Sequence, residues 1–130
     1  MKKFILSIDQ GTTSSRVVLY DSKFNKIDSV QKEFTQYFPK NGWIEHDALE
    51  IWHDIKKLIK KILKNNKLSS IHILSIGIAN QRETTVLWNK KNGKPIINII
   101  NTIPITRLSL SIVLSFLIIK FFTRRSFFLF

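Results

Sequence analysis

The chain has 130 residues, which is enough for one modest domain with its own hydrophobic core. A hydrophobic fraction of 44% excludes disorder along the whole chain, and the lack of cysteine excludes disulfides and thiolate metal sites. The formal net charge is +12, but residues 84–130 contain no Asp or Glu and carry seven of the Lys and Arg residues. This uneven distribution argues against a nucleic-acid-binding surface. The apolar run after Lys3 is too short for a signal peptide, so we expect a cytoplasmic protein.

The first third of the chain predicts three strands. Residues 3–9 are a short apolar run that indicates a buried strand, and residues 14–21 predict a second strand. The QGTT turn between them makes the pair a hairpin. Residues 26–34 alternate as a third strand, and residues 36–46 are expected to form a loop because of Pro39 and Asn41-Gly42.

A helix is predicted to begin at Asp47. The DALE sequence places an acid, Glu50, three positions after a capping residue, which is the capping-box arrangement. We expect His46 to fix the preceding loop through a hydrogen bond. Apolar residues at helical spacing form one stripe, with Trp52 expected in the core: Leu49, Ile51, Trp52, Ile55, Leu58, Ile59, Ile62 and Leu63. The lysines off this stripe predict a solvated face: Lys56, Lys57, Lys60, Lys61 and Lys64.

Two further strands and a tight turn follow the helix. Residues 71–79 are typical of a buried strand, residues 84–88 predict another, and residues 91–94 form the turn. The order of three strands, a helix and two strands predicts a single α/β domain with a mixed sheet.

A row of hydroxyl groups follows Gly11 at the hairpin turn: Thr12, Thr13, Ser14 and Ser15. A glycine lets backbone N–H groups approach an anion, and the short hydroxyls and Arg16 add donors and a positive charge. Asp9 could hold Mg²⁺ directly or through water, because hard cations prefer carboxylate oxygen. This pattern indicates a nucleotide phosphate site. The alternative is that Thr and Ser simply suit a turn and a strand.

Three blocks taken together resemble the amino-terminal part of the glycerol kinases of the FGGY carbohydrate kinase family. They are DQGTTSSR (9–16), YFPKNGWIEHDALEIW (37–52) and GIANQRETTVLWNKKNGKPI (77–96). The resemblance implies a ribonuclease H-like, actin-like ATPase fold, here incomplete, and the ATP-dependent phosphorylation of glycerol to sn-glycerol 3-phosphate. NQRETT favours glycerol over the sugars of other FGGY kinases, which stay an alternative.

The resemblance also implies roles for individual residues. Thr12, Thr13 and Ser14 would contact the phosphates of ATP and of the product, with Arg16 beside them. Arg82 and Glu83 would hold the glycerol hydroxyls, since a planar fork of donors and an acceptor together can fix a diol. The family's general base, an aspartate, and its adenosine-binding domain would lie beyond residue 130. We therefore expect no activity from this chain alone, and not the homo-oligomer of the family.

The family pattern is expected to span residues 1–96 and to stop there. Residues 97–130 are rich in Ile, Leu and Phe and contain neither an acid nor a glycine, a mix typical of AT-rich DNA translated in the wrong frame. We interpret them as a non-family tail produced by a frameshift or a gene lesion. A membrane-associated or binding product that reuses the fragment is the main alternative, although residues 108–119 are too short to span a bilayer. A divergent domain is the other.

Overall fold

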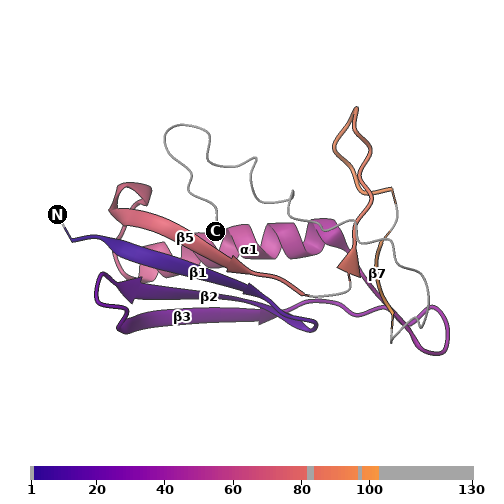
Figure 1. Ribbon diagram of the computed structural model, residues 1–130, viewed down its shortest axis with the longest axis horizontal. Helices are drawn as coiled ribbons and strands as arrows, with labels where there is room; N and C mark the ends of the chain where they lie inside the picture. The colour runs from indigo at the N-terminus through magenta and orange to yellow at the C-terminus, as the bar shows by residue number, and fades with distance from the viewer. Residues whose placement is uncertain (1, 82–83, 97, 103–130) are drawn as a thin grey trace.

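A computed structural model of the chain describes residues 2–81, 84–96 and 98–102 (Figure 1). The elements in chain order are β1 (Phe4–Gln10), β2 (Ser14–Asp21), β3 (Lys26–Glu33), β4 (Trp43–His46), α1 (Ala48–Asn65), a 3-10 turn (Ser70–His72), β5 (Ile73–Ala79), β6 (Thr84–Thr85) and β7 (Ile99–Thr102). Within the described ranges, no helix has the length and apolar character needed to cross a membrane.

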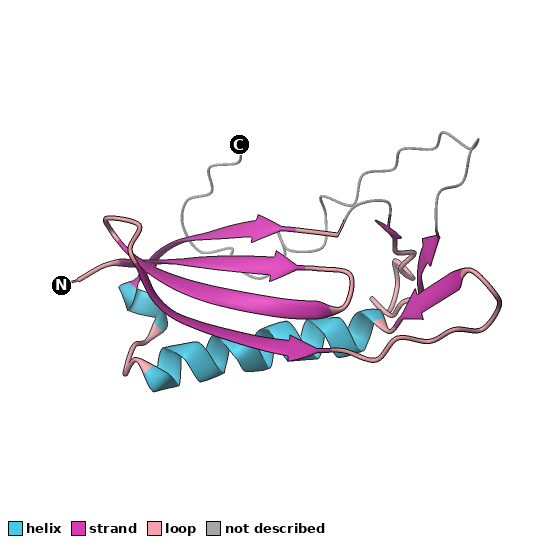
Figure 2. Cartoon of the chain, turned by 90° about the horizontal axis from the view of Figure 1, so that it is seen from below, coloured by secondary structure: helices cyan, strands magenta, loops and turns pink. Residues whose placement is uncertain are grey.

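The main sheet has four strands in the order β3-β2-β1-β5. The pairs β1–β2 and β2–β3 are antiparallel, whereas β5 runs parallel to β1. Helix α1 lies along one side of this sheet (Figure 2) and packs on β2 and β3. The core between the two layers is aliphatic and includes Leu6, Ile8, Val17, Leu19 and Val30 from the strands. The predicted hairpin, third strand and mixed α/β sheet are therefore confirmed.

Helix α1 presents most of the predicted apolar stripe to the sheet, with its most deeply buried residues at Ile51, Ile55, Leu58 and Ile62, but Leu49 is 36% exposed. Asp47 is the N-cap and accepts a hydrogen bond from the backbone N–H of Leu49 at 2.7 Å, as expected. The other half of the predicted capping box, in which Glu50 would reach back to the helix cap, is wrong. Glu50 instead accepts hydrogen bonds from the backbone N–H and the hydroxyl of Thr35, at 3.2 and 3.1 Å. Trp52 is only half-buried, with Lys56 over its ring, so it is not core.

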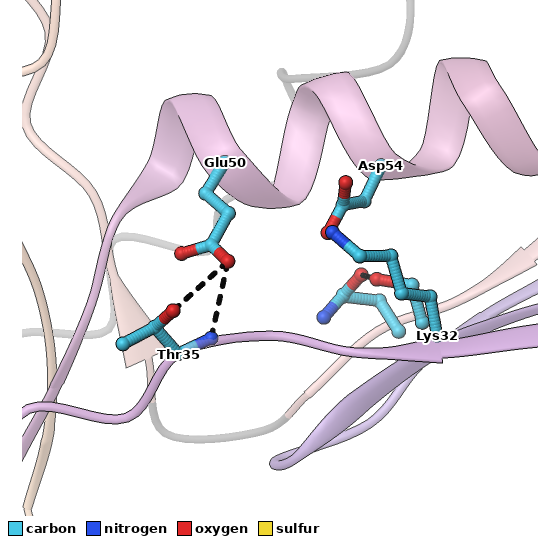
Figure 3. A network of polar contacts seen from close by, with 6 residues as sticks. Lys32, Thr35, Glu50 and Asp54 are labelled. Carbon is cyan, nitrogen blue, oxygen red and sulfur yellow. Dashed lines mark hydrogen bonds and ion pairs between the residues drawn. The ribbon is translucent and has the colours of Figure 1, made fainter.

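Polar contacts also fasten α1 to the end of β3 (Figure 3). Asp54 on α1 is 2% exposed, and its Oδ2 lies 2.5 Å from Nζ of Lys32 on β3. The Glu50 contact with Thr35 lies one helical turn earlier. Because Lys32 pairs in register with Ser15 of β2, these contacts fix the helix relative to the tip of the β1–β2 hairpin.

A second, small sheet of order β4-β7-β6 lies beyond the hairpin tip, at the end of the molecule away from the N-terminus (Figure 2). Strand β4 falls in the segment predicted as a loop, so that prediction is wrong over residues 43–46. β4 pairs antiparallel with β7, and Tyr37 bridges to Glu45. The predicted strand over 84–88 is reduced to two residues, followed by a bridge between Trp88 and Pro95. Gly93 has φ +68° in the predicted turn.

His46 is fully buried at the end of β4, with its ring edge-on to Phe34 at 4.9 Å between centroids. Neither ring nitrogen has a hydrogen-bond partner among the described residues, so the predicted loop-fixing hydrogen bond is not formed there. Burial lowers the pKa of His46 below its usual 6.5, and the nearby Glu50 carboxylate opposes this shift only in part. His46 therefore serves this structure as a neutral, packed ring.

Candidate functional site

The candidate site is the turn of the β1–β2 hairpin, residues 10–14. The backbone N–H of Gly11 donates to the carbonyl of Ser14 at 3.0 Å and closes the turn. A Cβ at position 11 would lie 3.3 Å from that same oxygen, so a side chain there would crowd the turn. The N–H of Phe34 donates to the carbonyl of Thr13 at 3.3 Å and joins the turn to the end of β3. The turn is thus held from both sides while its outer surface stays open.

The four hydroxyls at the turn fall into two groups. Thr12 and Thr13 are exposed at the tip, and the Ser14 oxygen accepts a hydrogen bond from Nε2 of Gln31 at 2.9 Å. Ser15 is fully buried and donates to Oε1 of Gln10 at 2.6 Å. Thr12, Thr13 and Ser14, which are predicted to bind phosphate, therefore lie at the surface of the turn. The Ser15 hydroxyl instead stabilises the turn through its hydrogen bond to Gln10.

Asp9 and Arg16 face each other directly across β1 and β2, where they are partners in the strand register. Nη2 of Arg16 lies 2.7 Å from Oδ2 of Asp9, and both side chains are about half exposed. The pair places one carboxylate and one guanidinium next to the hydroxyl turn. No group of three or more His, Cys, Asp or Glu side chains capable of holding a metal occurs in the described part of the chain. A divalent cation here would rely on Asp9, water and phosphate oxygens, the set of ligands that Mg²⁺ accepts.

The predicted substrate residues Arg82 and Glu83 lie outside the described residues. The flanking residues Gln81 and Thr84 show that this segment connects the end of β5 to β6. Because β5 runs parallel to β1, the C-terminal end of β5 lies at the same end of the sheet as the hairpin turn that follows β1.

Two residues that support the turn were not predicted, Gln10 and Gln31. Gln10 also donates from Nε2 to the carbonyl of Gly11 at 3.2 Å. Gln31 stands opposite Arg16 in the β2–β3 register. The only signal for them in the sequence is strand alternation, which places Gln31 on a face but cannot show that its side chain reaches Ser14.

The class of protein follows from this architecture. An antiparallel three-stranded meander, a parallel fourth strand and a helix on one face form part of a ribonuclease H-like, actin-like ATPase domain, and the similar solved structures are kinases with that fold. They include the glycerol kinase of Plasmodium falciparum with ADP, at 39% identity and a TM-score of 0.68 over 76% of this chain and 20% of that one. They also include a gluconate kinase from Lactobacillus acidophilus, at 25% identity and a TM-score of 0.69 over 77% of this chain and 20% of that one.

The family is shown by sequence. Residues 4–103 match the N-terminal domain of the FGGY family of carbohydrate kinases, and this chain belongs to that family. Glycerol kinases from Alkaliphilus metalliredigens and Bacillus cereus are 51% and 55% identical to it, each over 77% of this chain and 20% of their own length. The chain therefore spans about a fifth of the length of the curated relatives it matches. The matched region includes β7.

Proposed function

We propose that this chain carries the phosphate-binding hairpin and part of the glycerol site of an ATP-dependent glycerol kinase. The observation that carries the proposal is the turn itself: two exposed threonines and a serine on a closed, glycine-containing hairpin, with Asp9 and Arg16 beside them. Thr12, Thr13 and Ser14 would donate to phosphate oxygens, and Arg16 would supply charge. Asp9 would hold Mg²⁺, which when bound neutralises charge on the phosphates of ATP.

Glycerol is the proposed substrate because of how similarity is distributed among the FGGY kinases. Among the solved structures, the P. falciparum glycerol kinase is 39% identical to this chain, whereas the gluconate kinase and a xylulose kinase, both from L. acidophilus, are 25% and 26% identical. The glycerol kinases of A. metalliredigens and B. cereus reach 51% and 55%. The Arg82-Glu83 pair within NQRETT fits the need, because a guanidinium can donate to two vicinal hydroxyls while a carboxylate accepts from them.

We further propose that the chain alone does not phosphorylate glycerol. Phosphoryl transfer requires a residue that accepts the proton of the attacking hydroxyl, together with groups that position the nucleotide. The sequence contains no carboxylate after Glu83, and it spans only a fifth of its relatives. Because the family match continues to residue 103, past the expected boundary at residue 96, only residues 104–130 are proposed to arise from a frameshift or lesion. Sequencing the gene in all three frames tests this, because family sequence resuming in another frame is the expected result and its absence would contradict it.

The phosphate proposal is tested by measuring MgATP binding to the purified chain by calorimetry. Removing the hydroxyls in the double variant Thr12→Val, Thr13→Val is expected to weaken binding by about tenfold or more, since hydrogen bonds to charged groups contribute about 1.5–3 kcal/mol. Ser22→Ala, which removes an exposed hydroxyl at the other end of β2, is the matched control and should leave the affinity unchanged. Equal affinities for all three proteins would contradict the assignment of the hairpin.

Activity is measured separately, with labelled ATP and glycerol and with the complete B. cereus enzyme as the positive control. We expect no product above the no-enzyme background from this chain. Turnover above that background would overturn the proposal that it is inactive alone.

A further inference from the structure

The two edges of the main sheet have different chemistry. Strand β3 carries charged side chains along its length, among them Lys26, Lys32 and Glu33, and charges on an edge strand discourage pairing with another chain. Strand β5 at the opposite edge reads ILSIGIA, with no charge and no proline. Among the described residues, no strand pairs with the outer edge of β5 (Figure 1). The charges on β3 therefore discourage a further strand from pairing there, whereas β5 has no such charges.

The apolar cover over the sheet becomes thinner at β5, where Ile73 and Ile76 pack against the core but are only partly buried. One row of residues crosses all four strands in register: Ile78 on β5, Ile8 on β1, Val17 on β2 and Val30 on β3. Residues opposite one another in a sheet share a face, so this row lies on the side covered by α1. The exposed fractions are 3%, 0% and 8% for Ile8, Val17 and Val30, but 40% for Ile78. Helix α1 packs on β2 and β3, which leaves the β5 end of the row open.

Two further aliphatic side chains are exposed at the start of β5, at the opposite end of the strand from Ile78. Ile71, just before β5, is 63% exposed, and Leu74 on β5 is 65% exposed. This contradicts the prediction that residues 71–79 form a buried strand. A continuous apolar run is typical of a parallel strand that is covered on both faces and paired on both edges. The β5 sequence therefore suits a strand with a second neighbour.

We propose that β5 is a docking edge for the part of an FGGY kinase polypeptide that follows the region matched here, and that this chain can join such a polypeptide as a separate molecule. The incoming polypeptide would add a strand along β5 and cover Ile78. Its identity is inferred from length: the chain spans a fifth of its relatives, so four-fifths of each relative is sequence that this chain does not match. The inference rests on membership of the family, and it does not depend on glycerol being the substrate.

The test is co-expression of the full 130-residue chain, tagged, with a glycerol kinase that lacks the matching region. The partner is taken from whichever of the B. cereus, Enterococcus faecalis and A. metalliredigens enzymes reassembles from its own two pieces, which serve as the positive control. The expected result is a one-to-one complex by size-exclusion chromatography and native mass spectrometry. Failure of this chain to form a complex with that same partner would overturn the inference.

Two substitutions locate the contact. Ile78→Lys places a charge on the open end of the row and is expected to weaken the complex by about tenfold or more. Ile27→Lys is the matched control, because Ile27 is also an exposed isoleucine, at 48%, but lies on β3 at the other edge. It should change the affinity less than about twofold. Equal effects of the two variants would show that the partner does not dock at β5.

Hydrogen exchange of the chain alone gives a readout that needs no partner. The backbone amides of β5 that point away from β1 should exchange rapidly in the free chain and become protected in the complex. Strong protection in the free chain would overturn the inference, because a second copy or residues 103–130 would then occupy the edge. Glycerol phosphorylation by the complex is measured independently. A complex without activity would leave the docking edge in place and would contradict the proposed function.

Discussion

The hairpin side of this molecule and the β5 side are built from similar aliphatic residues but differ in how completely these are covered. On the hairpin side, β1, β2 and β3 pair with one another, and α1 buries Val17, Leu19 and Val30 to 8% exposure or less. On the β5 side, Ile78 and Leu74 stay 40% and 65% exposed. The difference shows that the hairpin rests on strands whose inner face is covered by the described residues, whereas the described residues cover β5 incompletely.

Truncating one aliphatic side chain on each side gives the largest expected difference. Leu19→Ala on β2 removes a side chain with no exposure and should lower the free energy of unfolding by about 3 kcal/mol. Ile78→Ala on β5 should cost less than about 1 kcal/mol, because water already reaches that side chain. Urea unfolding of the two variants and the parent measures both values. Equal losses would show that β5 is as well covered as β2.

The Lys32–Asp54 ion pair sharpens the account of the hairpin side. Lys32→Met should lower the free energy of unfolding by about 3 kcal/mol, because it leaves the buried Asp54 carboxylate without its partner. Asp54→Asn should cost only about 1 kcal/mol, because the Lys32 side chain is 48% exposed and can reach water. Lys60→Met, on the solvated face of α1, controls for the loss of a lysine. A larger cost for Asp54→Asn than for Lys32→Met would contradict this reading.

The start of α1 allows a test of which acid acts as the cap. Asp47→Ala removes the side chain that accepts from the N–H of Leu49 and should cost about 1 kcal/mol. Glu50→Gln keeps an acceptor for Thr35 and should cost less. Thermal unfolding followed by circular dichroism at 222 nm measures both. A greater loss for Glu50→Gln than for Asp47→Ala would contradict the assignment of Asp47 as the cap.

His46 gives the smallest expected effect, a pH dependence of stability. Burial lowers its pKa in the folded state below 6.5, so below that pH the unfolded chain binds more protons and stability falls as pH falls. Above 6.5 the ring is neutral in both states and adds no pH dependence. The change is measured between pH 5 and 7.5, where Asp21 stays charged because hydrogen bonds from Asn25 lower the pKa of its carboxyl. His46→Gln should flatten the profile, and an unchanged slope would contradict the assignment.

The sequence predicted the elements that are specified locally. The hairpin was recognisable from Gly11 between two apolar runs, and Asp47 from its position before an apolar stripe. Strand β4 was missed because its partner β7 lies more than 50 residues further along the chain, and because four residues after Asn41-Gly42 carry no periodicity of their own. Glu50 was assigned to the helix cap because nothing in the sequence shows that Thr35 lies beside it.

The site was predictable in part for the same reason. The candidate residues Thr12, Thr13, Ser14, Arg16 and Asp9 are contiguous or nearly so, and their closeness at the hairpin follows from the sequence, while their binding role stays a prediction. The supporting contacts of Gln31 and Phe34 with that turn depend on the β2–β3 register, which a local pattern does not fix. The exposure of β5 was not predictable, because the composition of a strand does not show whether a second strand lies beside it.

The most direct test of the difference between the two sides is native-state hydrogen exchange of the purified 130-residue chain, resolved by strand. The account predicts that the amides of β2 and the central turns of α1 exchange only through global unfolding, while the outward-facing amides of β5 exchange several orders of magnitude faster. Equal protection of β2 and β5 in the monomeric chain would contradict it, because the β5 edge would then already be closed.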